Sequence, residues 1–583
     1  MCGIVGSVGI LPAKEIMVKA CDSIAHRGPD DSGLYYSEKE QIALGHRRLS
    51  IIDLSKDGHQ PFLSADARYA VIFNGEIYNY IEIKKDLEGF YNFITKTDTE
   101  VLLAAYIKWG ERCVEKFNGM FAFAIWDAQE KKLFCARDRL GEKPFFYNYI
   151  VERFFFASEV KALLSLGVRP EANEAIIFDY LHFGVYDHSD ETFFKNIKIL
   201  SPGHYLVWEN NTIEIKKYWD LADVPIVNYS SDSEIEEKFR FLLSDSISIR
   251  FRSDVPVGVN LSSGLDSNSL YHYALQVTGD KLHTFSMCLE SEEYNECDVI
   301  GEILNGKQKE FWHSCYLKPE EVLSGAEQMN KIQDQPFGGI PTIAYNSLIG
   351  LADANNVTVL LEGQGVDEIL AGYPYYKMEL EKDELNLTGG GDSITLGQDM
   401  SKLVNQGILN NDFTRCYHDR RLQFFRPFTS NLLNAQYRDI RYTKLPRVLR
   451  FNDHVTMFHG KELRLPFLDY RIVEFCFGLP AKYKIRNGSH KFLLRKIMNG
   501  IIPKKIMEKE KKVFGAIQTE WFRKYFRAEI MNLLESQSFR SRVYWDQIKM
   551  RQEVENFFKG EIQNSFFIWQ CFNLDLWFKN FID

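Results

Sequence analysis

Roughly the first 200 residues alternate short apolar runs with polar turn residues, a pattern typical of β-strands. Five of these runs predict strands, at Tyr69–Asn74, Gly119–Trp126, Lys132–Arg137, Phe154–Ala157 and His204–Trp208. Apolar residues at helical spacing lie between them, at Ile81–Leu87 and Thr99–Lys108. This mixture of strands and helices predicts a layered α+β domain.

The pattern changes in the second part of the chain, where strands and helices alternate. A predicted helix at Glu234–Phe251 precedes predicted strands at Val257–Leu261, Leu282–Leu289 and Val357–Leu361, each followed by a turn and a helix. This alternation predicts an α/β domain with a parallel, doubly wound sheet, and the chain beyond about Asp412 is largely helical. The stretch 221–233 has the composition of a linker, so we expect domains at residues 1–220 and 234–583.

Composition narrows the class of protein. The 583 residues are 45% hydrophobic and 26% charged, which is typical of a globular chain of several domains. The net charge of −10 argues against a uniformly basic nucleic-acid surface, and no apolar run reaches the roughly 18 residues of a membrane helix. The N-terminus also lacks the pattern of a signal peptide. We therefore expect a cytoplasmic protein that binds neither nucleic acid nor membranes.

The ten cysteines are scattered along the chain and form no Cys-x-x-Cys motif. Cys288 and Cys297, nine residues apart, are the closest pair, so reduced thiols are expected throughout.

Cys2 is a candidate nucleophile because of its position at the N-terminus. Removal of Met1 would expose a cysteine with a free α-amine, whose ordinary pKa of about 7.7–8.0 suits it as a general base for its own thiol.

Several motifs follow Cys2 in a fixed order. They are CGIVG at residues 2–6, AHRGPD at 25–30, HRRLSIID at 46–53, FNGEIYN at 73–79 and TDTE at 97–100. Together they resemble the glutaminase domain of class II glutamine amidotransferases, specifically that of glutamine-hydrolysing asparagine synthetases. The resemblance implies that the first domain is an N-terminal nucleophile fold, an αββα sandwich, with Cys2 as its nucleophile.

The remaining glutaminase residues fit the chemistry of amide hydrolysis. The reaction passes through an oxyanion that needs preorganised donors, and the Asn74 side chain and the Gly75 N–H resemble the donors of the family. Arg48 suits the α-carboxylate of glutamine, and Glu76 and Asp98 suit its α-ammonium. Taken one at a time, these residues allow simpler interpretations, because Asn-Gly is also a hairpin turn and the charged residues could lie on the surface.

A second motif follows the first predicted strand of the second domain. The hexapeptide Ser262–Ser267, SSGLDS, brings hydroxyls and a glycine to a helix N-terminus, where backbone N–H groups bind anions. It has no lysine and therefore suits pyrophosphate as a leaving group, although a serine-capped helix start is the simpler interpretation. It resembles the pyrophosphate loop of the ATP-pyrophosphatase superfamily, with Ser263 in place of a glycine. The resemblance implies that Asp266 binds Mg²⁺.

Two later segments extend this resemblance. EGQGVDE at residues 362–368 resembles the second catalytic loop of the family, with Asp367 as the other Mg²⁺ ligand, and Lys491 matches the lysine that stabilises negative charge during adenylation. Gln364 stands where the family has a glutamate; a neutral amide cannot act as a base, and Glu362 is the candidate substitute. The expected nucleotide-binding residues are Leu261, Ser262, Ser263, Gly264, Asp266, Ser267, Met287, Glu362 and Gly363.

The resemblance implies a two-site enzyme that uses glutamine, ATP and Mg²⁺. Glutamine is hydrolysed at Cys2, a carboxylate is activated as an acyl-adenylate at the second site, and ammonia passes between the sites through an internal tunnel. Aspartate is the expected acceptor, and a homodimer is the expected assembly. Gln364, Ser263 and the segment DQPFGG at residues 334–339 also match relatives that amidate sugar uronic acids in polysaccharide biosynthesis. A glutaminase with a degenerate synthetase domain, or a non-catalytic scaffold, would also fit the sequence.

Overall fold

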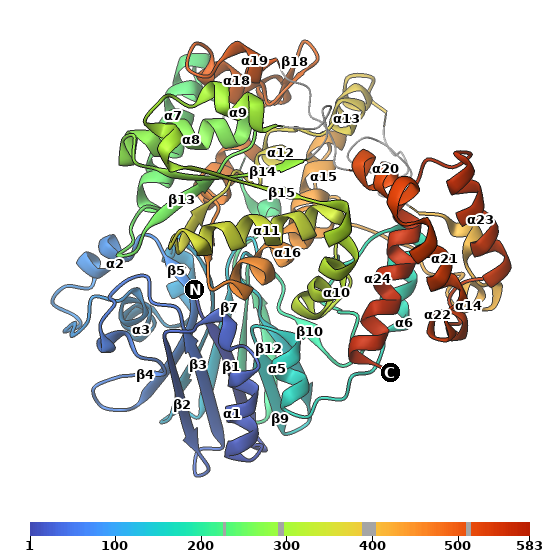
Figure 1. Cartoon of the computed structure of the whole chain (residues 1–583). Helices are drawn as coiled ribbons and strands as arrows, with labels where there is room; N and C mark the ends of the chain where they lie inside the picture. Colours follow the sequence, from blue (N-terminus) through green and yellow to red (C-terminus); the bar gives the residue numbers. More distant parts are fainter. Residues whose placement is uncertain (226–228, 290–295, 388–403, 509–514) are drawn as a thin grey trace.

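The N-terminal domain contains two antiparallel sheets (Figure 1). A computed structural model describes residues 1–225, 229–289, 296–387, 404–508 and 515–583, and within them each sheet has six strands. The first sheet has the order β10 (Lys198–Ile199), β8 (Phe146–Ile150), β9 (Arg153–Ala157), β1 (Gly3–Gly9), β3 (Ile42–Arg48), β2 (Asp31–Ser37). The second has the order β12 (Thr212–Lys217), β11 (His204–Glu209), β7 (Lys132–Arg137), β6 (Gly119–Asp127), β5 (Tyr69–Ile77), β4 (Phe62–Leu63).

Apolar residues from facing strands fill the space between the two sheets. Ile4 and Val8 of β1 pack in one buried cluster with Ile72 of β5 and Trp126 of β6. Helices α1 (Lys14–Asp22) and α5 (Val160–Ser165) pack on the first sheet, whereas α2 (Tyr80–Asp86) and α3 (Asp98–Trp109) lie beside the second. The layers therefore have the αββα order that the motifs imply.

The second domain is built on a parallel sheet. Within the described residues it has five strands in the order β15 (Trp312–Leu317), β14 (His283–Leu289), β13 (Val257–Asn260), β16 (Val359–Leu361), β17 (Glu462–Arg464). Figure 1 shows α7 (Asp232–Ile249) and α8 (Leu265–Thr278) on one side of this sheet, and α11 (Ile340–Ala354) and α16 (Leu445–Phe458) on the other. The sheet is thus doubly wound, as predicted.

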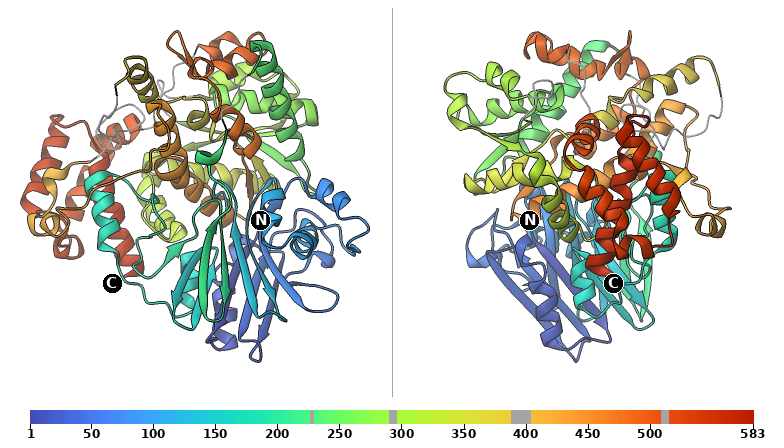
Figure 2. Two further views of the ribbon diagram at one scale, coloured as in Figure 1. Left: turned by 180° about the vertical axis from the view of Figure 1, so that it is seen from behind. Right: turned by 45° about the vertical axis from the view of Figure 1, so that its right-hand side comes forward.

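Helices dominate the C-terminal part of the chain. They include α20 (Gly515–Tyr525), α21 (Arg527–Glu535), α22 (Gln537–Ser541), α23 (Gln547–Lys559) and α24 (Phe566–Phe581). Helix α24 packs against α10 (Val322–Gln333) and lies beside α6 (Glu174–Phe178) of the first domain (Figure 2). Gln570 of α24 donates a hydrogen bond of 2.6 Å to the Tyr180 carbonyl, so the C-terminal helix joins the two domains.

The predicted elements match the structure closely, with shifts at their ends. The five predicted strands of the first domain lie in β5, β6, β7, β9 and β11. The predicted helix Glu234–Phe251 begins earlier, at Asp232, because the Ser231 side chain caps it by accepting a hydrogen bond from the Glu234 N–H. The expected linker includes residues 226–228, which lie outside the described residues. In the described part of the chain, no helix has both the length and the apolar character to span a bilayer.

The expectation of reduced thiols throughout is wrong for one pair. Cys288 in β14 and Cys297 at the start of α9 (Cys297–Ile303) form a disulfide. The end of the strand and the start of the helix bring their Cα atoms to 5.7 Å, which is within the usual range for a disulfide. Spacing along the sequence could not predict this approach. The other eight cysteines carry free thiols.

Candidate active sites

Cys2 and Asn74 meet where the two sheets of the first domain come together. The backbone N–H of Cys2 donates a hydrogen bond of 3.1 Å to Asn74 Oδ1. Asn74 is completely buried, and its Nδ2 has no hydrogen-bond partner among the described residues. Since a buried amide donor without a partner is costly, this N–H group is set up to bind an acceptor beside Cys2.

Gly75 lies inside strand β5 and not in a hairpin turn. Asn74 pairs with Ala122 and Gly75 with Phe121 across to β6, so the interpretation of Asn-Gly as a turn is wrong. A Cβ added at Gly75 would lie 2.1 Å from the Met120 carbonyl oxygen. The strands can approach this closely only because the residue is glycine.

A small cavity of about 30 Å³ lies beside Cys2. Its lining includes the predicted glutamine-binding residues Arg48, Glu76 and Asp98, all of which are buried and therefore are not surface charges. Arg48 is held by backbone carbonyls of the adjacent loop, since its Nη1 donates to Ser55 O at 2.8 Å and its Nη2 contacts Asp53 O. The structure thus brings the predicted glutaminase residues together around one cavity, except Asn74, which bonds to Cys2 but does not line the cavity.

The acidic residues of this cavity favour a bound cation. Burial and the neighbouring Asp98 carboxylate raise the pKa of Glu76 well above its usual value. Burial likewise raises the pKa of Asp98 to about 6. Two carboxylates with raised pKa values are stabilised in their charged form when an ammonium group binds between them. This arrangement suits the α-ammonium of an amino acid.

The Cys2 thiol is not activated by its surroundings. Burial raises its pKa above the usual value, and its sulfur lies 4.0 Å from the Leu49 carbonyl oxygen. Because the thiolate is the reactive form, attack by Cys2 requires a nearby base. The α-amine that removal of Met1 would create on Cys2 is suitably placed to act as this base.

The loop Ser262–Ser267 connects β13 to the N-terminus of α8. The hydroxyl groups of Ser262 and Ser267 lie 2.9 Å apart, and the Asn268 amide donates to the carbonyls of Ser262 at 2.9 Å and Gly264 at 2.7 Å. These bonds fix the loop from within. The N–H of Ser263 donates to Glu296 Oε2 at 3.2 Å, so the added side chain of Ser263 is accommodated with its residue fully buried.

Lys491 joins the two predicted metal ligands. It follows β19 (Ser489–His490), and its Nζ lies 2.6 Å from Asp266 Oδ2 and 2.7 Å from Asp367 Oδ1. Burial lowers the pKa of Lys491, but the two carboxylates outweigh burial and raise it. Two carboxylates that converge on one cationic nitrogen also fit a divalent cation, for which carboxylate oxygens are preferred ligands. A Cβ at Gly372 would lie 2.0 Å from Asp367 Oδ1, so this approach also requires glycine.

Glu362 follows β16 and is held by two side chains. Its carboxylate accepts hydrogen bonds from the Tyr345 hydroxyl at 2.8 Å and from Gln364 Nε2 at 3.2 Å. Burial raises the pKa of Glu362. Gln364 therefore positions a carboxylate two residues earlier in the loop and does not supply one itself.

The other predicted nucleotide-binding residues make fewer contacts with the Ser262–Ser267 loop. Gly363 approaches the phosphate loop closely, because a Cβ there would lie 3.3 Å from the backbone of Asp266. Leu261 is buried, and its N–H donates to the Phe285 carbonyl at 2.8 Å. Met287 lies in β14 and is partly buried. Among the described contacts, none joins Met287 to the loop.

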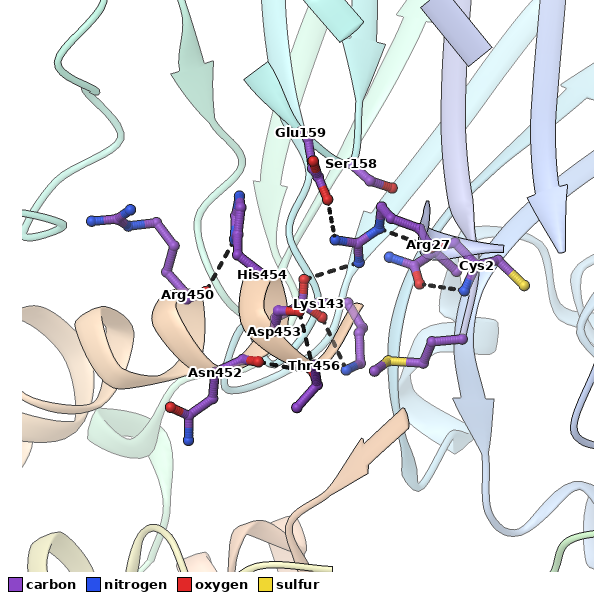
Figure 3. Close-up of polar contacts among 12 residues, drawn as sticks. Cys2, Arg27, Lys143, Ser158, Glu159, Arg450, Asn452, Asp453, His454 and Thr456 are labelled. Atoms are coloured by element: carbon purple, nitrogen blue, oxygen red, sulfur yellow. Dashed lines mark hydrogen bonds and ion pairs between the residues drawn. The ribbon is translucent and has the colours of Figure 1, made fainter. Parts of the chain in front are cut away.

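Sequence reasoning missed a buried ionic network between the domains (Figure 3). Arg27 forms ion pairs with Glu159 at 2.8 Å and with Asp453 at 2.9 Å, and Lys143 lies 3.3 Å from Asp453. It also missed Glu462, a glutaminase-pocket residue that belongs to the second domain. The available signal was the pattern at residues 461–465, KELRL, where charged residues alternate with leucine inside a strand.

Comparison with known proteins gives matches to both halves. The family profile of the glutamine amidotransferase domain matches residues 1–219, and that of asparagine synthase matches residues 238–579. The glutamine-hydrolyzing asparagine synthetase 1 of Bacillus subtilis (strain 168) is 29% identical over 99% of this chain and 96% of its own length. Putative glutamine-hydrolyzing asparagine synthetase 2 of Methanocaldococcus jannaschii is 36% identical over 71% of this chain and 84% of its own.

Other matches are more distant. Amidase chry2 of Gibberella zeae is 26% identical over 87% of this chain and 86% of its own length. Among solved structures, a glutamine phosphoribosylpyrophosphate amidotransferase from B. subtilis is 18% identical, with a TM-score of 0.29 over 48% of this chain and 65% of that one. This structural match is partial.

A cysteine pocket in an αββα sandwich, joined to a parallel-sheet synthetase domain, defines a glutamine-dependent amidotransferase. The chain belongs to the asparagine synthase family, whose profile covers more than half of it. Enzymes of this family use glutamine, ATP and a carboxylate substrate.

Proposed function

We propose that this enzyme converts aspartate to asparagine, with hydrolysis of glutamine to glutamate and cleavage of ATP to AMP and pyrophosphate. The observation that carries the two-site part of the proposal is the position of Arg464 between the two sites, and aspartate as acceptor is supported by the relatives named asparagine synthetase. Its guanidinium lies 3.4 Å from Glu76 in the glutamine pocket, and its backbone carbonyl accepts a hydrogen bond of 3.1 Å from the Glu362 N–H. One residue thus contacts both sites, which supports direct passage of ammonia from one to the other.

In the first reaction, the Cys2 sulfur attacks the side-chain amide carbon of glutamine. The α-amine of processed Cys2 takes the thiol proton and returns it to the departing ammonia. The Asn74 amide and the Gly75 N–H stabilise the oxyanion. Water then cleaves the thioester to give glutamate. The unpartnered Nδ2 of buried Asn74 supports this assignment.

In the second reaction, the substrate carboxylate attacks the α-phosphorus of ATP and pyrophosphate leaves. The Ser262–Ser267 loop binds the pyrophosphate, and Lys491 stabilises the charge that develops on it. Asp266 and Asp367 would hold Mg²⁺, which neutralises phosphate charge when bound. Ammonia then attacks the acyl-adenylate and gives the amide and AMP.

A second acceptor is favoured by one observation. The carboxylate of the second loop is Glu362, held by Gln364 and Tyr345, whereas the resemblance implies a glutamate at position 364. A carboxylate displaced in this way changes the charge distribution of the acceptor site. We therefore propose a sugar uronic acid or another carboxylate as the second candidate. One relative that matches most of this chain is named amidase chry2 and not asparagine synthetase.

The experiment is to incubate purified enzyme with glutamine, ATP and Mg²⁺ and to vary the carboxylate. Aspartate should give AMP, pyrophosphate and asparagine in equal amounts. AMP formed with uronic acids but not with aspartate would establish the second candidate instead. Glutamate release without AMP for any carboxylate would mean that the protein acts as a glutaminase alone.

The proposal includes a homodimer located in the cytosol. It is supported by the family resemblance alone. Light scattering coupled to size-exclusion chromatography measures the assembly directly, and a mass close to the 67.9 kDa of one chain would contradict the dimer.

A further inference from the structure

Glu462 belongs to the synthetase domain but lines the glutaminase pocket. It begins β17, its side chain is completely buried, and the cavity beside Cys2 includes it. Its Oε2 accepts a hydrogen bond of 2.9 Å from the Met1 ammonium group, and its Oε1 accepts one of 2.6 Å from Arg464 Nε. The pocket is therefore completed across the domain boundary.

We propose that Glu462 forms a binding site for an ammonium group in the processed enzyme. The inference rests on the proposed function, because it requires Met1 to be removed. In the structure, the Met1 ammonium occupies this site and lowers the pKa of Glu462, together with Arg464, against the effect of burial. Removal of Met1 moves the N-terminal amine to Cys2, whose nitrogen lies 3.1 Å from Asn74 Oδ1, and leaves Glu462 with its bond from Arg464. A buried carboxylate that loses one of two cationic partners is destabilised and binds a replacement cation favourably.

A second residue points to the same ligand independently. Glu76 is only 3% exposed, and its Oε1 has no hydrogen-bond partner among the described residues. It lines the same cavity, and burial, Asp98 and Glu462 raise its pKa, whereas Arg464 and the Met1 ammonium lower it. Three buried carboxylates, those of Glu76, Asp98 and Glu462, thus line one cavity beside Cys2.

Two ammonium groups are candidate ligands for this position in the cavity. One is the α-ammonium of glutamine, which would make Glu462 a substrate-binding residue supplied by the synthetase domain. The other is the ammonium ion in equilibrium with the ammonia that Cys2 releases. In that case Glu462 would be the first binding site for this ion between Cys2 and the residues Arg464 and Glu362. The chemistry is the same, and kinetics separates the two.

The test compares Glu462→Gln with Glu474→Gln, which changes a carboxylate of the same domain that bonds to Trp219 outside the pocket. Glutamate release, amide formed per glutamate, and synthesis from added ammonium chloride are measured for both. If glutamine is the source, Glu462→Gln raises the KM for glutamine about tenfold or more, the loss expected for one charged hydrogen bond, with kcat nearly unchanged. If released ammonium is the source, KM stays constant and amide per glutamate falls severalfold.

Two results would overturn the inference. One is a Glu462→Gln enzyme that matches Glu474→Gln in both KM and amide yield. The other is an equal loss of all three activities, which indicates a structural role. Glu462→Asp keeps the charge one methylene farther away and should give an intermediate effect; wild-type behaviour of this variant also contradicts the site. Failure of the wild-type enzyme to release glutamate would instead refute the proposed function.

Discussion

Arg27 of the first domain and Asp453 of the second form a buried ion pair of 2.9 Å, with 0% and 3% of their side chains exposed (Figure 3). The same guanidinium donates through Nε to the Cys2 carbonyl at 3.1 Å. The position of the nucleophile therefore depends on a residue of helix α16 in the other domain. This contact gives a physical route by which the synthetase domain influences glutamine hydrolysis.

The first prediction concerns this ion pair. Asp453→Asn takes a buried counter-charge away from Lys143 and from Arg27, which keeps its ion pair with Glu159, and this loss should cost on the order of 3–5 kcal/mol of stability. Thermal unfolding should show a clearly lower midpoint, and the kcat of glutaminase should fall as well. Glu115→Gln, which removes an exposed pair with Arg112, is the control and should leave the midpoint unchanged. Equal midpoints for the two variants would contradict the role of the pair.

The second prediction concerns the oxyanion. Asn74→Ala removes the unpartnered buried donor, so the kcat for glutamate release should fall about 100- to 1000-fold with little change in KM. Asn79→Ala, in which the lost amide bonds to the Lys116 carbonyl outside the pocket, is the matched control. A rise in KM at constant kcat would show that Asn74 binds substrate and does not stabilise the transition state.

The third prediction concerns pH. Because the pKa of Asp98 is about 6 in the free protein, its carboxylate is protonated below that pH and binds an ammonium weakly. The kcat/KM for glutamine should therefore rise with pH through about 6, in addition to the rise that accompanies deprotonation of the Cys2 α-amine, and Asp98→Asn should lower kcat/KM and remove the component near 6. The effect of Asp98 on stability runs the other way. The raised pKa favours the folded state at low pH, and this contribution declines as pH rises from about 4 to about 6. A pH-independent kcat/KM between 5 and 7 would count against the assignment.

The fourth prediction separates the two sites. Lys491→Met removes the cation that joins Asp266 and Asp367 and should abolish AMP formation with glutamine or ammonium as the nitrogen source. Glutamate release should persist. Lys496→Met, in which the lost cation pairs with Glu236 on the protein surface, provides the control. AMP formation by the Lys491→Met enzyme at a rate similar to the control would refute its role in adenylation.

The strands and helices with regular periodicity could be predicted from the sequence, because their apolar faces are continuous. Strand β17 was missed although charged residues alternate with leucine there, because its Glu462 and Arg464 are charged and are tolerated inside the protein only as ion partners of each other and of groups from the first domain. The interface between the two domains could not be predicted either, because it also consists of charged residues. Ion pairs such as Arg27 with Asp453 join residues more than 400 positions apart, and no local pattern reports them.

Part of each candidate site could likewise be predicted from the sequence, and part could not. The motifs located Cys2, Asn74, Asp98, Asp266 and Lys491, because each has a residue type that its chemistry requires. They could not show that Gln364 holds Glu362, since hydrogen bonding within a loop depends on its backbone path. Nor could they show the disulfide, which depends on how a strand end and a helix start meet.

The central claim is that Cys2 supplies nitrogen to a separate synthetase site in the same chain. The most direct measurement is the amide and AMP formed by purified Cys2→Ala, with glutamine or with ammonium chloride as the only nitrogen source. We predict full synthesis from ammonium and none from glutamine. Continued synthesis from glutamine by this variant would contradict the claim.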